Sequence, residues 1–345
     1  MSQAEDATNI GRRGWLERLR GLLSARILIP SVVALGLLAY VAYVASARAS
    51  GGELWSIVKD TWVLILVLTF PYLVCRAVIW HGLLRQLCIR VSWRNLAIAF
   101  SGGEMTKSLP AGIYVENLIL GRLSHLGRTW TVRSTTATTA TLGLECAIAV
   151  PVVLILGIPG ESWLRLALLA FVGGWIVILG LVRLLVAEAT AHLDSRALRW
   201  LRGVADSVKE FLDAGVELLT PRTLLYLIPT AIYMLIYVVD LYFIARAAGV
   251  HDFSFLDAMA TYGVVVLALV LIPIPTEIGI SEFTGLGILV AYGVPQATAA
   301  VIILGLRLLA TGATILVAGA AFLLLHAGVH EDLAAPRGVE EGTAS

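Results

Sequence analysis

The sequence consists of long apolar blocks separated by short polar segments. Each block is about 20 residues long and is bounded by arginine clusters or by proline and glycine, so it matches the ~30 Å hydrocarbon core of a bilayer. The pattern therefore predicts helices that span the membrane fully over residues 27–45, 61–84, 134–157, 164–187, 223–247 and 295–325.

Two other apolar stretches are interrupted. Residues 96–120 are broken by Gly102, Gly103 and Glu104, then by Lys107 and by residues 109–112, and residues 258–292 are broken at 273–279. The resulting halves are too short to cross a bilayer. Backbone that leaves helical geometry at this depth is tolerated only where protein or a water-filled cavity satisfies its polar groups. We therefore predict two re-entrant, broken helical hairpins.

The fold class that follows is all-α. It is a polytopic membrane bundle of six full spans and two re-entrant hairpins, in which an inverted repeat would place the hairpin tips near the midplane. A short internal likeness fits a repeat. Both breaks carry proline, then glycine, then glutamate, as Pro110, Gly112 and Glu116 and as Pro275, Gly279 and Glu282.

Arginine placement predicts the orientation. One cluster, at 85–94, precedes the first broken segment and another, at 122–133, follows it, so the positive-inside rule places both flanks in the cytoplasm. The first hairpin then enters from the cytoplasmic side and the second from the opposite side. Both termini are predicted to be cytoplasmic, and the location is the cytoplasmic membrane.

The domain organisation is simple. Residues 1–26 form a basic cytoplasmic leader, which we interpret as preceding an uncleaved anchor, and residues 27–326 form the membrane domain. Within it, apolar residues at spacings of three and four predict an interfacial amphipathic helix over about 192–219. The polar residues 327–345 are predicted to be a disordered cytoplasmic tail.

Composition supports the membrane class and excludes several functions. Hydrophobic residues make up 59% of the chain and charged residues 14%, against roughly 45–50% and 25% in soluble domains. The net charge of +1 and the lack of a long basic run predict no nucleic-acid partner. The three cysteines have no metal-ligand spacing, and no phosphate-binding loop or nucleophile motif occurs. We expect no metal and no cofactor.

Ionisable residues at membrane depth are candidates for function, because each costs about 2.5 to 3.5 kcal/mol on insertion scales. Together with the proline of the first break, the candidates for substrate binding are Glu104, Lys107, Pro110, Glu116, Glu277, Glu282 and Arg307. The candidates for structural charge pairs or an alternative site are Arg76, Glu145 and Asp240. The competing interpretation of each is a buried ion pair, for instance Glu282 with Arg307, that only closes the bundle.

Several of these motifs together resemble a known family. Residues 76–84, 109–112, 275–282 and 293–295, followed by Arg307, are similar in order and spacing to the transmembrane flippase-like domain of lysylphosphatidylglycerol synthases and its stand-alone relatives. The resemblance covers about residues 61–325 and implies movement of a lipid to the other leaflet.

The sequence departs from the family pattern at both breaks. Ile119 stands where the family's first motif carries an arginine, and Thr276 and Glu277 stand where its second motif carries two glycines. The headgroup charge of the substrate is therefore left open. Because only residues 326–345 follow the last predicted span, we expect no synthase domain and no enzyme activity of that kind.

Three functions remain as hypotheses. The first is translocation of a phospholipid or lipid-linked substrate through a polar groove between the hairpins. The second is a membrane enzyme or accessory subunit acting on polyprenyl-phosphate-linked sugars, in which the carboxylates would be catalytic. The third is a non-catalytic scaffold that binds a partner through the amphipathic helix. The expected partners are a membrane lipid and either a second copy or a partner membrane enzyme.

Overall fold

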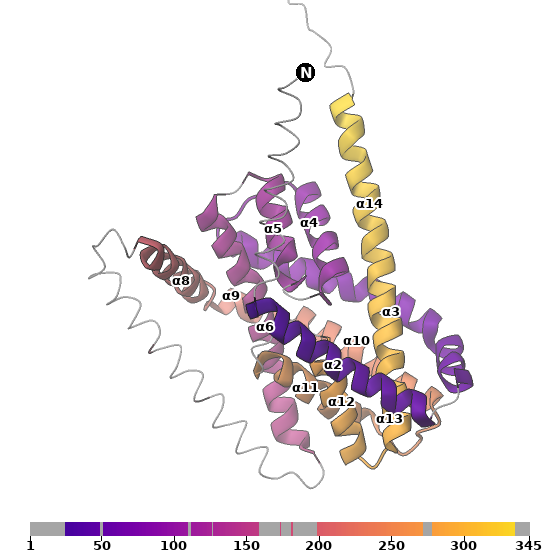
Figure 1. Ribbon diagram of the computed structural model, residues 1–345. Coiled ribbons are helices and arrows are strands. Elements are labelled where there is room, and N and C mark those ends of the chain that lie inside the picture. The colour runs from indigo at the N-terminus through magenta and orange to yellow at the C-terminus, as the bar shows by residue number, and fades with distance from the viewer. Residues whose placement is uncertain are drawn as a thin grey trace, which may run out of the picture.

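The computed structural model describes residues 25–48, 51–109, 112–125, 127–158, 173, 181, 199–271 and 278–334. These residues form helices and no strands (Figure 1). Nearly all of the predicted span over 164–187 and of the leader lies outside the described residues.

Long apolar helices confirm an all-helical, multi-pass membrane protein. In the described part of the chain, four are long and apolar enough to cross a bilayer, and they cover four of the predicted full spans: Leu54–Gln86, Thr129–Leu156, Pro221–Ala247 and Gln296–His326. They belong to α3 (Gly51–Gln86), α6 (Arg128–Leu156), α9 (Pro221–Leu224) with α10 (Leu227–Ala247), and α13 (Gln296–Leu306) with η3 (Arg307–Thr311) and α14 (Gly312–Ala334).

The outer face of α3 shows why a bilayer is the natural surrounding. Large apolar side chains recur on it at spacings of three and four, and all are more than half exposed: Val63, Val67, Phe70, Val74 and Val78. Such spacing places them on one stripe of a helix. An exposed apolar stripe of this length is unfavourable in water and favourable against lipid.

The first broken segment forms a helical hairpin. Helix α4 (Trp93–Thr106) is followed by η1 (Gly112–Tyr114) and α5 (Val115–Leu123), and α4 and α5 pack on each other. The two open ends of the hairpin are joined, because the Asn95 amide donates to the Leu123 carbonyl at 3.2 Å. With 14 and 9 residues, the helices are about 21 and 14 Å long, shorter than the hydrocarbon core.

The second broken segment is built in the same way. Helices α11 (Phe255–Leu271) and α12 (Ile280–Ala291) pack against each other, and the break between them lies mostly in residues 272–277, outside the described residues. The open ends again meet, because the Phe253 and Tyr292 rings lie edge to face with centroids 5.9 Å apart.

Helix α6 shows how the two hairpins are placed. Its first residue, Arg128, follows the open end of the first hairpin closely in the chain. At its other end, the Gly157 carbonyl accepts a hydrogen bond from the Tyr292 hydroxyl at the open end of the second hairpin, at 3.2 Å. The 29 residues of α6 extend about 43 Å. The open ends of the two hairpins therefore lie at opposite ends of one long helix (Figure 1).

Two hydrophobic clusters fill the interior. One is built largely from α3, α6 and α10, and the other from α10, α12, α13 and α2 (Ala25–Arg48), the helix that covers the predicted span over 27–45. Tyr237 of α10 and Tyr262 of α11 pack against both clusters. Their rings are stacked, with centroids 5.2 Å apart, and mark the boundary between the clusters.

Two peripheral helices refine the prediction. Helix α8 (Arg199–Glu217) lies within the range of the predicted amphipathic helix and packs on α6, where Arg133 pairs with Glu210 at 3.0 Å and with Glu217. Helix α14 ends at Ala334, a few residues beyond the end of the apolar span at His326, and the tail over 327–345 stays a prediction. Between Leu325 and Ala334 no proline interrupts the helix, and the next one, Pro336, follows closely.

Candidate functional site

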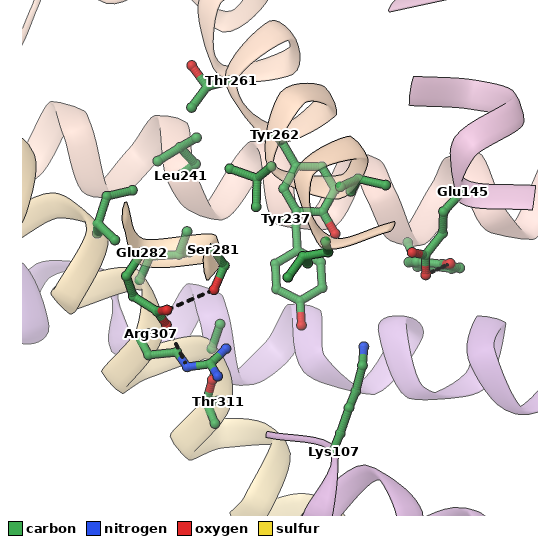
Figure 2. Close-up of a pocket in the computed structure, with 17 residues that line it drawn as sticks. Lys107, Glu145, Tyr237, Leu241, Thr261, Tyr262, Ser281, Glu282, Arg307 and Thr311 are labelled. Atoms are coloured by element: carbon green, nitrogen blue, oxygen red, sulfur yellow. Dashed lines mark hydrogen bonds and ion pairs between the residues drawn. The ribbon is translucent and has the colours of Figure 1, made fainter. Parts of the chain in front are cut away.

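A cavity of about 100 Å³, with charged and hydroxyl side chains set among apolar ones, lies where the two hydrophobic clusters meet (Figure 2). Since one water needs roughly 10 to 15 Å³ of such space, the cavity has room for several waters or a small polar group. Its described lining comes from both halves of the chain. Lys107 belongs to the break of the first hairpin, and Ser281 and Glu282 begin the second helix of the other hairpin. Described residues beside the breaks of both hairpins thus line one cavity.

On one side of the cavity lies the ion pair of Glu282 and Arg307, whose Oε1 and Nε atoms are 2.9 Å apart. The other carboxylate oxygen of Glu282 accepts hydrogen bonds from the Gly279 N–H at 2.5 Å and from the Ser281 hydroxyl at 2.9 Å. Glu282 stands at the third position of α12, so it also caps that helix. Gly279 has a φ of 89°, a conformation that glycine adopts without a steric penalty.

Arg307 is placed by an irregular turn. It begins η3, a single stretch of π-helix between α13 and α14. Such bulges occur frequently at functional sites, because they change the direction of side chains along an otherwise regular helix. The Nη2 atom of Arg307 is buried and has no hydrogen-bond partner among the residues that the structure describes. In Figure 2 the guanidinium points into the cavity.

A second charged cluster lies behind the opposite side. The Arg76 Nε is 2.9 Å from a Glu104 oxygen, and Arg76 Nη1 is 3.5 Å from Glu145. The Tyr233 hydroxyl donates a hydrogen bond to the same Glu145 oxygen, and the guanidinium lies 5.8 Å from the Tyr233 ring centroid. Arg76 and its partners connect α3, α4, α6 and α10, and all of them are buried. Of this cluster, Glu145 and Tyr233 reach the cavity.

Lys107 connects the second cluster to the cavity. Its Nζ donates to the Tyr72 hydroxyl at 3.3 Å, and that hydroxyl donates to Glu104 at 3.0 Å. The ammonium also lies 5.9 Å from the Tyr72 ring centroid. Figure 2 shows the Lys107 amine and the Arg307 guanidinium pointing toward the same space from different sides. Two cations from distant parts of the chain therefore face one cavity.

Other predicted residues lie elsewhere. Glu104 pairs with Arg76 and does not line the cavity, and Glu116 accepts from the Thr138 hydroxyl at 2.6 Å, which ties α5 to α6. Asp240 is 3% exposed and is also away from the lining, and its Oδ1 has no hydrogen-bond partner in the described part of the chain. Pro110 and Glu277 lie outside the described residues.

The structure adds lining residues that the sequence analysis missed. They carry hydroxyl groups at the cavity: Tyr233, Tyr237, Thr261, Tyr262, Ser281 and Thr311. Tyrosines four residues apart in an apolar span, at 233 and 237, were a usable signal, since this spacing places them on one helix face. Thr261 is fully buried, and its hydroxyl has no hydrogen-bond partner among the described residues.

The class defined by this fold and site is a multi-pass helical membrane protein with a cavity between interrupted helices, in which charged side chains take part in the lining. The family described as lysylphosphatidylglycerol synthase TM region matches residues 27–319. The chain belongs to that family, which confirms the resemblance found in the sequence and indicates a membrane, lipid-related function. Searches of curated proteins and of solved structures find no match.

Proposed function

We propose that the protein moves a phospholipid or another lipid-linked substrate between the leaflets of the cytoplasmic membrane. The observation that carries the proposal is the cavity between the tips of the two hairpins, lined by Lys107 from one and by Ser281 and Glu282 from the other. Transporters commonly bind substrates where interrupted helices of two repeats meet near the midplane.

The placement of the hairpins supports re-entry from opposite sides. Each has its two open ends together, through Asn95 with Leu123 in the first and Phe253 with Tyr292 in the second. These ends lie at opposite ends of α6, which is long enough to cross the bilayer. Each hairpin then enters and leaves on one side, and the polar cavity lies between the tips. A headgroup would cross there while its acyl or prenyl tails stay in lipid.

The hydrogen bonds of the carboxylates favour transport over catalysis. Glu282 accepts from Arg307, Gly279 and Ser281, and Glu145 accepts from Arg76 and Tyr233. A general base needs a lone pair directed at the proton it removes. Glu282, which has both of its oxygens engaged, is better suited to holding the cavity in shape.

Reconstitution tests the proposal. Purified protein in liposomes with fluorescent phospholipids should move lipid from the inner to the outer leaflet, measured as the fraction that dithionite quenches. Arg307→Ala and Glu282→Gln should lower the rate by about tenfold or more, as expected for losing a hydrogen bond to a charged group. Arg90→Gln, at an exposed arginine in the loop before α4, is the matched control and should leave the rate unchanged.

One outcome would count against translocation, and another would count against the site. If the rate is that of protein-free liposomes for every lipid tried, the transport proposal fails. If both cavity variants stay fully active in a protein that transports, the site assignment is wrong. Product formed from a polyprenyl-phosphate donor by the purified protein alone would instead support the membrane-enzyme hypothesis.

A further inference from the structure

We infer that Asp240 binds and releases a proton during the transport cycle, so that lipid movement is coupled to the movement of protons across the membrane. The inference rests on the proposed function and adds its source of energy. It is drawn from a carboxyl group that is buried at membrane depth and, among the described residues, binds no neighbouring side chain.

Helix α10 holds Asp240 well inside the membrane. The residue stands seven positions before the end of this helix, which corresponds to about 10 Å along its axis. Its side chain is buried, and its Oδ1 atom has no hydrogen-bond partner in the described part of the chain. The other buried carboxylates described there all have donors, since Glu104, Glu145 and Glu282 pair with arginines and Glu116 accepts from a threonine.

The cations that reach α10 from its neighbours are already paired. Helices α3, α6, α11 and α13 pack against α10. The titratable side chains that face it from these elements, or from η3 directly after α13, are Tyr72, Arg76, Glu145, Tyr262 and Arg307. Arg76 is bound by two glutamates and Arg307 by one. Within α10, Arg246 lies over the Tyr242 ring, 5.0 Å from its centroid. None of these cations forms an ion pair with Asp240.

The part of α3 that lies level with Asp240 supplies no charge. Helices α3 and α10 run in opposite directions, and the Tyr72 and Tyr237 rings meet with centroids 5.3 Å apart. This register places Thr69, three residues before Tyr72, level with Asp240, three residues after Tyr237. The Thr69 hydroxyl donates to a carbonyl of its own helix at 2.8 Å. A hydroxyl engaged in this way does not stabilise a carboxylate.

These surroundings favour the neutral form of Asp240. Removing a carboxylate from water without a counter-ion is so unfavourable that the group takes up a proton instead. Asp240 therefore holds a proton in this conformation. A structural role has little support, because the side chain does not join two helices as Glu116 does. Ionisable residues inside membrane spans commonly belong to proton relays.

The cavity gives the proton a route to water. Tyr237, one helical turn before Asp240, and Leu241, the next residue, both line it. When the cavity opens to one side of the membrane, water comes within about one helical turn of the carboxyl group and stabilises its charged form. The O–H bond then breaks and the proton leaves to that water. It forms again with a proton from water on the other side, so only the difference in proton concentration is used up.

The charge of Asp240 then decides which conformation is favoured. The closed cavity accepts the neutral form alone, whereas the open cavity accepts both, so protonation shifts the population toward the closed state. A proton also fits this position better than a metal cation. Transporters bind sodium where helices are unwound and carbonyl groups are freed, but α10 runs past Asp240 as one continuous helix.

Infrared spectroscopy tests the bound proton without any transport. A protonated carboxyl group has a carbonyl stretching band that a carboxylate lacks, and this band should be weaker in Asp240→Asn than in the unaltered protein at neutral pH. Asp252→Asn, at an exposed aspartate in the loop before α11, is the matched control and should leave the band unchanged. An equally strong band in Asp240→Asn would refute the proton site. If Asp240→Asn does not fold, Asp240→Val replaces the unpartnered carboxyl with an apolar group and serves the same comparison.

A pH difference across proteoliposomes tests the coupling. Trace fluorescent phosphatidylglycerol is placed in both leaflets, and the fraction that dithionite quenches gives its distribution. With one proton moved per lipid, a difference of one pH unit should change the ratio between the leaflets by up to about tenfold, and reversing the difference should reverse the change. Asp240→Asn should show no change, and Asp252→Asn should behave as the unaltered protein.

The outcomes separate the coupling from the proposed function. If the protein moves the lipid but its distribution ignores the pH difference, or follows a sodium difference instead, the coupling is overturned and translocation stands. If no lipid moves while the infrared band depends on Asp240, the proton site stands and the proposed function fails.

Discussion

The Nε atom of Arg307 lies 2.9 Å from Oε1 of Glu282, and this pair joins the start of α12 to the π-turn between α13 and α14. The Glu282 side chain is 2% exposed and that of Arg307 is 21% exposed. Because Glu282 also caps α12, one carboxylate fixes the second hairpin, the irregular turn and the direction of the Arg307 guanidinium.

We expect the two residues to be coupled in stability. Arg307→Gln leaves a buried carboxylate without its cation and should destabilise the protein by about 3 to 5 kcal/mol. Adding Glu282→Gln removes the unpaired charge and should recover most of the lost stability. Thermal unfolding of the three variants in detergent gives the coupling energy as a double-mutant cycle. Additive effects would show that the pair contributes nothing beyond its separate residues.

Gly112 should be essential to the first hairpin. A Cβ at this position would lie far inside van der Waals contact with the backbone carbonyl of Thr106, which cannot swing away as a side-chain tip can. Gly112→Ala should therefore destabilise the protein by about 1 to 3 kcal/mol and lower its yield. Gly143→Ala in α6 is the matched control, since nothing lies within 4 Å of its Cβ. Similar melting temperatures for the two variants would contradict the close packing of Gly112 against the Thr106 carbonyl.

Arg76 should be required for the packing of four helices. Arg76→Gln leaves Glu104 and Glu145 buried without their shared cation, at an expected loss of about 3 to 5 kcal/mol. Arg85→Gln removes an exposed arginine from the same helix and should change stability by no more than about 0.5 kcal/mol. Unfolding midpoints in detergent measure both. If Arg76→Gln unfolds at the same midpoint as the unaltered protein, other groups must compensate the negative charges of Glu104 and Glu145.

The sequence predicted the breaks well because their causes are local. A proline with glycine and charged residues close by interrupts each apolar stretch, whereas the isolated Pro71 and Pro151 lie inside continuous helices, so it is the clusters that locate the two hairpins. The exact bounds were harder, since α14 continues past the predicted end of its span. Helix length at a polar end depends on local propensity and on the next stop signal rather than on hydropathy.

The site was only partly predictable, because a charge in an apolar stretch does not reveal which way it faces. Lys107, Glu282 and Arg307 line the cavity, whereas Glu104 and Glu116 join helices. These groups all look alike in the sequence. The hydroxyl groups were missed because they are not conspicuous in the sequence. Thr261 and the tyrosines are common in apolar spans and raise the polarity of the span only slightly.

Labelling of single cysteines should reveal the sidedness of both hairpins. The native Cys88 precedes the first hairpin and is exposed, and exposed Arg122 and Gln296 follow the first and second hairpins. With the other cysteines replaced, Cys88 and Arg122→Cys should react with a membrane-impermeant maleimide on the cytoplasmic side only. Gln296→Cys should react from the outside only.

This pattern follows from the geometry of the open ends. Asn95 and Leu123 hold the two ends of the first hairpin together at 3.2 Å, so positions 88 and 122 cannot lie on opposite sides of a bilayer about 30 Å thick. Tyr292 is hydrogen-bonded to Gly157 at the far end of α6, which places Gln296 on the other side. Labelling in intact cells and in inverted vesicles distinguishes the two sides. Reaction of Cys88 and Arg122→Cys from different sides would mean that the segment crosses the membrane, and the cavity between opposed tips would lose its structural basis.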